Sequence, residues 1–290
     1  MILPKEKEET LNQIVADLQQ TDNVLAIVLG GSYATGKATA ISDLDIGIYY
    51  ADQNPFRIDE IRTIAQKYAV NGQPTVTGFY EWGPWVNGGA WIETASGQVD
   101  FLYKNIEQIT ATVEKAQNGE WEKHFEQQPP YGFSSLIFLA ETISCIPLYD
   151  PDHIISDLKA AVQSYPPKLK QAVIQQSLWS AEFSIWHADS FCKKKDVYNV
   201  MGCLTRAVKN LVDVLFAVNE IYPMGDKRAV EILGNTNQIP PNLSGKVDSI
   251  LCADKDTMSN NIDGLKRLFD ETVALTNGIY QPFYALKAGQ

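Results

Sequence analysis

The sequence lacks the features that would place it in a membrane, among secreted proteins or among disulfide-stabilised proteins. No apolar run approaches the roughly 20 residues that a membrane-spanning helix requires. The first residues, MILPKEKEETLNQ, turn polar too early for a secretory signal. The four cysteines are scattered and form no CxxC pair, which is typical of reduced thiols. We therefore expect a cytoplasmic protein with no membrane partner.

Positively charged residues are also outnumbered by negatively charged ones. Lysine and arginine together number 24, against 35 aspartates and glutamates, so the formal net charge is −11. An acidic surface repels the phosphate backbone of nucleic acids, and no basic stripe runs along the chain, so a nucleic-acid partner is disfavoured. Small cationic substrates and bound metal ions are compatible with this charge. The three histidines show no metal-ligand spacing.

The 290 residues are enough for two domains. Strand-like and helical patterns are interspersed up to residue 150, whereas helical periodicity dominates after PLYDPD (147–152). We therefore predict an α+β domain at 1–150, followed by an all-α domain at 151–290. The expected elements of the first domain are strands at 23–31 and 43–50, a hairpin at 90–103, and helices at 5–20, 56–70, 105–117 and 134–146.

The stretch LGGSYATGKATAISDLDIGIYY (29–50) combines a glycine turn with a pair of aspartates. Gly30, Gly31 and Ser32 follow an apolar strand, and such a turn exposes backbone N–H groups that bind phosphate. Asp43 and Asp45 alternate with apolar residues of the next strand, so they project from one face, about 6–7 Å apart. Carboxylates this close repel each other unless a proton or a cation compensates. Mg²⁺ suits them, because it takes oxygen ligands and leaves positions for phosphate.

Asp100 is the candidate for a third carboxylate. In GQVDFLY (97–103) it lies mid-strand among apolar neighbours, where an unpaired aspartate would be costly. If its strand lies beside that of Asp43 and Asp45, three carboxylates meet at one edge of the sheet. This arrangement suits two-metal nucleotidyl transfer, with Asp100 either as a metal ligand or as the group that takes the proton of the acceptor hydroxyl.

The segment GGSYATGKATAISDLDIGIYY, with a later Asp100, resembles the signature of the nucleotidyltransferase superfamily of the DNA polymerase β type. That signature is a Gly-Ser pair, an Asp-x-Asp about ten residues on, and a third aspartate on a later strand. Within the superfamily, the helical second domain resembles that of the aminoglycoside and lincosamide nucleotidyltransferases. The segments WGPWVNGGAWIE and GCLTRAVKNL resemble a bacterial subfamily of nucleotidyltransferase-domain proteins. The resemblance implies a mixed-sheet catalytic domain.

The resemblance also implies roles for individual residues. Gly30, Gly31 and Ser32 would orient the triphosphate of ATP or another nucleoside triphosphate. Asp43, Asp45 and Asp100 would hold Mg²⁺ and form the catalytic set. Related enzymes often use a basic residue of the helical domain on the triphosphate. Lys227 and Arg228, at a helix start in MGDKRAVEIL, are the strongest candidates here, and we assign the role to Lys227. Antibiotic-modifying relatives often use a glutamate as general base, so Glu93 and Glu141 stand beside Asp100 for that role.

These features together predict an Mg²⁺-dependent transfer of a nucleoside monophosphate, AMP from ATP, to a hydroxyl group of a small-molecule acceptor, with release of pyrophosphate. The acceptor would be cationic and aminoglycoside-like, and it would contact the tryptophan-rich segment from Trp82 to Trp91 by stacking or cation–π contact. Alternatively, that segment is core packing. A separate alternative for the whole protein is a nucleotide-binding or antitoxin-like partner module with weak catalysis or none. The sequence leaves the choice of ATP or GTP, the general base and the oligomeric state open.

Overall fold

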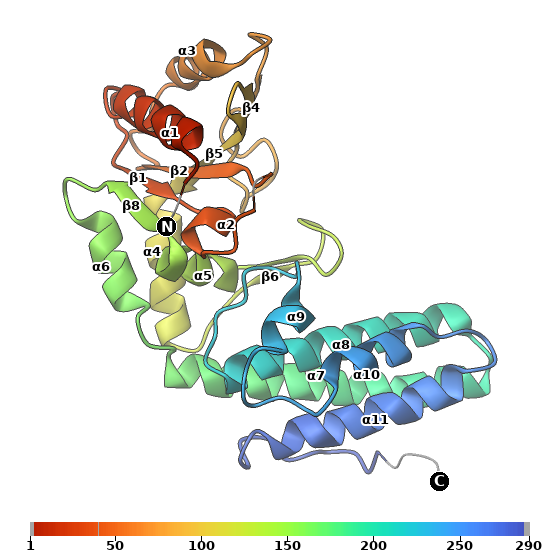
Figure 1. The fold of residues 1–290 in the computed structure, drawn as a ribbon. Helices are drawn as coiled ribbons and strands as arrows, with labels where there is room; N and C mark the ends of the chain where they lie inside the picture. The colour runs from red at the N-terminus through yellow and green to blue at the C-terminus, as the bar shows by residue number, and fades with distance from the viewer. Residues whose placement is uncertain (1–2, 40, 287–290) are drawn as a thin grey trace. The chain divides into compact units, whose positions relative to one another are not determined.

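The computed structural model describes residues 3–39 and 41–286, which fall into two compact units (Figure 1). The first unit holds the residues up to Lys115 and Glu122–Ser164, and the second holds Ala116–Trp121 and the residues from Tyr165 on. The division thus lies between Ser164 and Tyr165, later than the boundary that we predict at residue 150. Part of the reason is that α6 (Ile154–Ala161), which follows β8 (Ile146–Tyr149), packs on α5 (Leu136–Ser144) of the first unit.

The first unit contains all the strands that the described residues form, together with several helices. Its strands are β1 (Ala26–Leu29), β2 (Leu44–Tyr50), β3 (Thr75–Val76), β4 (Gly89–Thr94), β5 (Gly97–Asn105), β6 (Lys123–His124), β7 (Phe133–Ser134) and β8. Its helices are α1 (Lys5–Leu18), α2 (Gly31–Ala34), α3 (Ile58–Tyr68), α4 (Ile106–Gln117), whose last two residues cluster with the second unit, α5 (Leu136–Ser144) and α6 (Ile154–Ala161).

Among the described residues, six strands form one mixed sheet in the order β3-β4-β5-β2-β1-β8. β2 lies at its centre, antiparallel to β1 and parallel to β5. The β4–β5 hairpin turns at Ala95 and Ser96, where Gly97 has φ +113°. The prediction of an α+β domain with a mixed sheet is confirmed, as is the hairpin.

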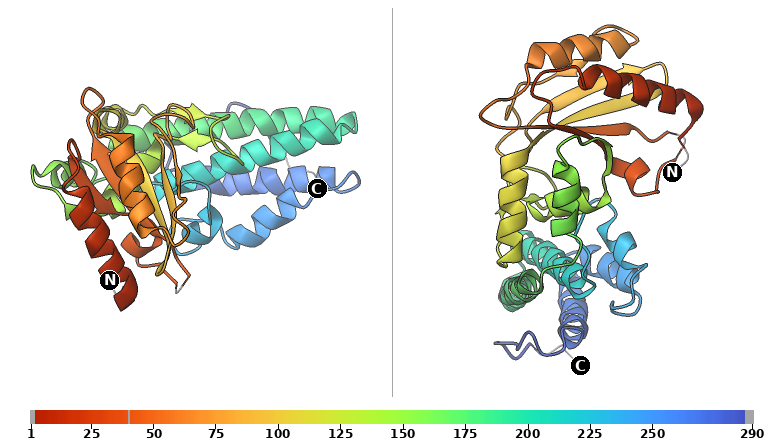
Figure 2. Two further views of the ribbon diagram at one scale, coloured as in Figure 1. Left: turned by 90° about the horizontal axis from the view of Figure 1, so that it is seen from above. Right: turned by 90° about the vertical axis from the view of Figure 1, so that its left-hand side faces the viewer.

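One face of this sheet forms the hydrophobic core of the first unit. Ile46 and Ile48 of β2 and Phe101 of β5 point into it and are fully buried. The apolar stripe of α1 (Leu11, Ile14, Val15 and Leu18) and Ile61 of α3 cover them. Figure 2 shows α1 and α3 side by side on this face, with α4 and α5 on the opposite side of the sheet. The core therefore fixes which residues of β2 and β5 face the other way.

The second unit is helical, as predicted. Two long helices, α7 (Pro167–Lys193) and α8 (Val197–Val218), pack along each other, and α11 (Met258–Ala274) packs on both. The remaining helices of this unit are α9 (Ala229–Leu233) and α10 (Leu243–Leu251). In the described ranges, no helix has both the length and the apolar character needed to cross a bilayer.

Candidate active site

The carboxylates Asp45 and Asp100 lie directly opposite each other on neighbouring strands. β2 and β5 run parallel with Asp45 in register with Asp100. Their neighbours Ile46 and Phe101, also in register, point into the core, so alternation directs both aspartates to the other face. Asp43 immediately precedes β2 and is exposed, so the strand begins one residue later than predicted. The structure thus brings Asp45 and Asp100 together and places Asp43 at the entrance to the same strand.

The Gly-Gly-Ser turn packs directly on Asp45. The Gly30 N–H donates a hydrogen bond to the Asp45 carbonyl oxygen at 2.8 Å, which extends the pairing of β1 with β2. Gly31 has φ +59°, and a Cβ atom there would lie only 1.7 Å from Oδ2 of Asp45. Only glycine therefore combines this backbone conformation with so close an approach of the carboxylate. Ser32 follows in α2, half-buried, and its hydroxyl makes no hydrogen bond to the described part of the chain.

The site concentrates negative charge. Burial raises the pKa of Asp45 to about 6, and the charges of Asp100, Asp43 and Glu141 contribute to this rise. Burial also raises the pKa of Asp100, with a further contribution from Asp43, although hydrogen bonds from Gln98 and Trp91 oppose the shift. The Gln98 bond, from Nε2 to Oδ1, measures 2.9 Å. A cation placed among buried carboxylates that repel one another stabilises their charged forms.

Lys104 and Glu141 complete the polar face, and our sequence reading did not assign Lys104 a role. Lys104 Nζ lies 2.6 Å from Oε2 of Glu141, which comes from α5, and the lysine side chain is only 14% exposed. The ammonium of Lys104 lowers the pKa of Asp45, in opposition to Glu141. Alternation along β5 places Lys104 on the same face as Asp100, so this position could have been found from the sequence. The other candidate glutamate, Glu93, is exposed and pairs with Gln98 across the hairpin.

The tryptophans of the predicted acceptor segment separate into two environments. Trp85 is buried, and its ring packs on Phe133 with the ring centroids 5.1 Å apart, so it belongs to the core. Trp91 lies opposite Asp100 in the sheet and stacks on Trp82, with the ring centroids 4.3 Å apart. Trp82 is 45% exposed. The Trp82–Trp91 pair is therefore the part of the segment that combines an accessible ring with proximity to the carboxylates.

Lys227 lies in the second unit, two residues before α9, and is exposed. The preceding residue, Asp226, is anchored by Lys209 of α8 at 3.1 Å, and Lys209 also pairs with Asp213 at 2.6 Å. The ion pair between Lys209 and Asp226 attaches the loop that contains Lys227 to α8. The role of Lys227 in binding phosphate stays a prediction.

The described residues do not by themselves complete a metal site. Within residues 3–39 and 41–286, no three histidine, cysteine, aspartate or glutamate side chains are gathered closely enough to ligate one ion. The donor set at the site consists of the carboxylates of Asp45 and Asp100, with Asp43 next to them. Mg²⁺ is commonly held by one or two carboxylates together with phosphate oxygens and water, and these residues fit that pattern.

Comparisons with known proteins match different parts of the chain. Residues 12–75 match the family model of the polymerase beta nucleotidyltransferase domain, and residues 138–227 match a domain of unknown function (DUF4037). Comparison with curated protein sequences gives no significant match. A solved nucleotidyltransferase-like protein from Exiguobacterium sibiricum 255-15 is 9% identical, with a TM-score of 0.48, over 94% of this chain and 78% of that one.

The family match spans the second half of α1 and all of β1, the Gly-Gly-Ser turn, β2 and α3. It therefore contains Gly31, Ser32, Asp43 and Asp45, and the sheet adds Asp100 in register with Asp45. Within the first unit, residues 12–75 accordingly match a nucleotidyltransferase domain of the polymerase β type.

Proposed function

We propose that the protein transfers a nucleoside monophosphate, AMP from ATP, to a hydroxyl group of a small-molecule acceptor. The register of Asp45 with Asp100, against the Gly-Gly-Ser turn, is the observation that carries this proposal. In the reaction, the acceptor oxygen forms a bond to the α-phosphorus, and the bond from that phosphorus to pyrophosphate breaks. The hydroxyl proton passes to a carboxylate of the protein.

The carboxylates provide the donors for Mg²⁺. Asp45 and Asp100, with Asp43 beside them, would hold the ion, which when bound would supply charge neutralisation to the triphosphate. The raised pKa values of Asp45 and Asp100 support this assignment, because a bound cation would offset both the burial of the carboxylates and the repulsion between them. The Ser32 hydroxyl and the N–H groups of Gly31 and Ser32, which have no partners inside α2, would orient the phosphates.

Asp100 is our candidate for the general base. A base works best when its pKa lies near the working pH, and the pKa of Asp100 is shifted in that direction. Glu141 is the alternative, because its charge influences Asp45, although one of its oxygens is bound to Lys104. The pH dependence of kcat/KM in Asp100→Asn and Glu141→Gln separates the two. Loss of the acidic limb should follow the variant that lacks the base.

The acceptor is proposed to be a small cationic molecule. The partly exposed ring of Trp82, the exposed carboxylate of Glu93 and the net charge of −11 favour a cation that stacks on an aromatic face. An aminoglycoside-like compound meets this description. The proposal rests on the chemistry of the surface beside Asp100.

The direct test is release of pyrophosphate from ATP or GTP with Mg²⁺, in the presence of a panel of cationic and neutral hydroxyl compounds. We expect acceptor-dependent release that is absent in Asp45→Asn. If ATP binds but no acceptor supports release, and a partner protein co-purifies instead, the alternative of a nucleotide-binding partner module is favoured.

A further inference from the structure

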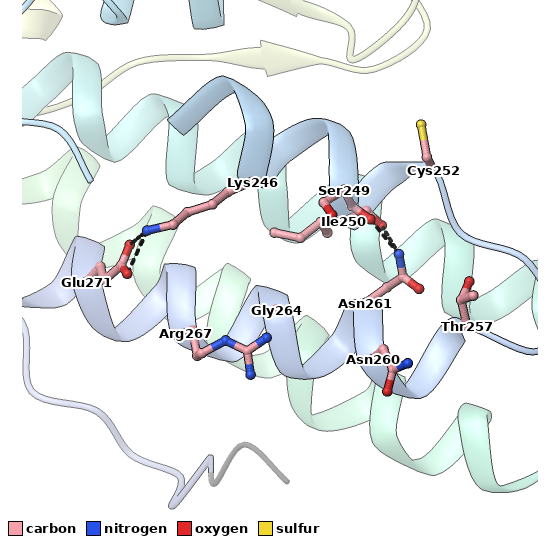
Figure 3. A pocket seen from close by; sticks show the side chains of 10 residues that line it. All are labelled: Lys246, Ser249, Ile250, Cys252, Thr257, Asn260, Asn261, Gly264, Arg267 and Glu271. Carbon is pink, nitrogen blue, oxygen red and sulfur yellow. Dashed lines mark hydrogen bonds and ion pairs between the residues drawn. The ribbon is translucent and has the colours of Figure 1, made fainter. Parts of the chain in front are cut away.

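A pocket of about 500 Å³ lies between α10 and α11 in the second unit (Figure 3). The α11 side is formed by Asn260, Gly264, Arg267 and Glu271, which are spaced by four, three and four residues and therefore share one face of the helix. Lys246 of α10 lies on the facing wall. The volume of the pocket is within the range of small-molecule sites, about 300–1,000 Å³.

Gly264 lines this pocket and adds no side chain to it. It lies in the interior of a 17-residue helix, where glycine costs about 1 kcal/mol relative to alanine. The backbone does not require glycine there, because its φ is not positive. A Cβ atom would make only ordinary contacts, 3.5 Å from Ile250 and 3.9 Å from Arg267. Neither conformation nor crowding therefore requires glycine here, and the position leaves space for a ligand in the pocket.

The pocket presents a cation with no partner. Arg267 makes no ion pair or hydrogen bond with any residue in the described ranges, although the chain as a whole is acidic. Figure 3 shows its guanidinium beside Gly264, away from the Lys246–Glu271 pair. In that pair, Lys246 Nζ lies 2.5 Å from Oε2 of Glu271, so the lysine is already neutralised. The positive charge available to a ligand therefore comes from Arg267.

The pocket also holds a buried acceptor with no donor. Asn261 is 8% exposed, and its amide nitrogen donates to the Ser249 carbonyl oxygen at 2.6 Å. Because that bond fixes the orientation of the amide, Oδ1 is the free atom, and it has no hydrogen-bond partner among the described residues. A buried acceptor without a donor is unfavourable by about 1–3 kcal/mol. A ligand hydroxyl or amine would supply the missing donor.

We propose that this pocket binds a small molecule that carries a phosphate or carboxylate group together with a hydroxyl or amine group. The anionic group contacts Arg267, and the donor group contacts Asn261. Glu271 limits the affinity for an anionic ligand in two ways. It places a negative charge in the pocket, and its ion pair neutralises Lys246. This site lies within the second unit and is independent of the nucleotidyl-transfer proposal.

Calorimetric titration of the full chain with inorganic phosphate, acetate and glycerol phosphate tests the proposal. Phosphate and acetate distinguish the two anionic groups, and glycerol phosphate adds hydroxyl donors, so it should bind more tightly than phosphate. Arg267→Gln should weaken binding at least about tenfold, as expected for loss of a charged hydrogen bond. Gly264→Leu should weaken binding strongly, because its side chain would occupy the space beside the Arg267 guanidinium.

Two further variants separate a specific site from general electrostatics. Lys255→Gln removes the same charge at an exposed position that does not line the pocket, and it should leave affinity unchanged. Glu271→Gln should increase affinity several-fold, because it removes a negative charge and frees Lys246. Equal affinity in the wild type and Arg267→Gln would overturn the proposal, as would absence of saturable binding for all three probes. Arg267 is exposed, so its variant remains informative if Gly264→Leu fails to fold.

Discussion

The two faces of β2 and β5 differ sharply, although adjacent residues of the same two strands form them. On one face, Ile46 lies opposite Phe101, and both are fully buried in the core. On the other, Asp45 lies opposite Asp100, and burial raises the pKa of both carboxyls. The apolar pair stabilises the fold, whereas the charged pair is held in place against its own repulsion.

This difference shows how the domain can hold two carboxylates next to each other. Two like charges directly opposite each other in a sheet are destabilising. The strands nevertheless keep this register, because a shift of one residue would move Ile46 and Phe101 out of the core. The hydrophobic face therefore fixes the geometry of the charged face.

The largest expected effect is on the core face. Phe101→Ala should lower the free energy of unfolding by about 3–5 kcal/mol, because it removes a large buried side chain and leaves a cavity. Urea unfolding followed by circular dichroism measures the change. Phe101→Leu, which retains most of the volume, should lose much less. A loss below 1 kcal/mol in Phe101→Ala would mean that this face does not hold the register.

A substitution on the charged face should reduce activity and leave the fold intact. Asp45→Asn should lower the rate of pyrophosphate release by at least about 10²–10³-fold, the loss typical of a group that stabilises charge in the transition state. Its fold should be retained, because the substitution is nearly isosteric. Steady-state kinetics at saturating ATP measures the effect. Activity within a few-fold of wild type would exclude Asp45 from the catalytic set.

Gly31→Ala tests the contact between the turn and Asp45. Alanine at φ +59° is strained by about 1–2 kcal/mol, and its Cβ would also collide with the Asp45 carboxylate. Gly36 is the matched control, since it has φ +71° and open space around it, so Gly36→Ala reports the backbone strain alone. We expect Gly31→Ala to be the less stable variant and to lose nucleotide affinity. Equal stability of the two would show that the contact does not constrain the turn.

Asp45 should also make stability depend on pH. Its pKa rises from 3.8 unfolded to about 6 folded, so the folded state binds the proton more tightly, and this contribution is lost as pH rises through about 4 to 6. Asp45→Asn should therefore be more stable than wild type by about 1–2 kcal/mol at pH 8, after allowance for partial solvent access. The difference should vanish near pH 4. Urea unfolding at both values measures it, and Asp43→Asn, at an exposed position, should show a smaller effect.

The smallest expected effect concerns the aromatic pair. Trp82→Ala removes a partly exposed ring, so it should change stability by less than about 1 kcal/mol and raise KM for a cationic acceptor by several-fold. Trp85→Ala provides the contrast, because it opens a cavity in the core and should reduce stability by more than the Trp82 substitution. Unchanged KM in Trp82→Ala would remove this ring from the acceptor site.

Local pattern was sufficient to predict much of the first unit. The alternation of DLDIGIYY predicted β2, and ASGQVDFLY predicted the hairpin strand that carries Asp100. Contacts between distant segments were not predictable in this way, because no local pattern encodes them. The Lys104–Glu141 pair joins residues 37 positions apart. β8 was also missed, because a four-residue edge strand that contains Pro147 has too short a pattern to distinguish from the end of a helix.

The most direct test of the account is calorimetric titration of ATP, with and without Mg²⁺, into the wild type and an Asp45→Asn/Asp100→Asn double variant. The account predicts that wild-type affinity depends on Mg²⁺ and that the double variant loses this dependence while remaining folded. ATP affinity that is the same in both proteins, with Mg²⁺ or without it, would contradict the claim that the paired carboxylates form a metal–nucleotide site.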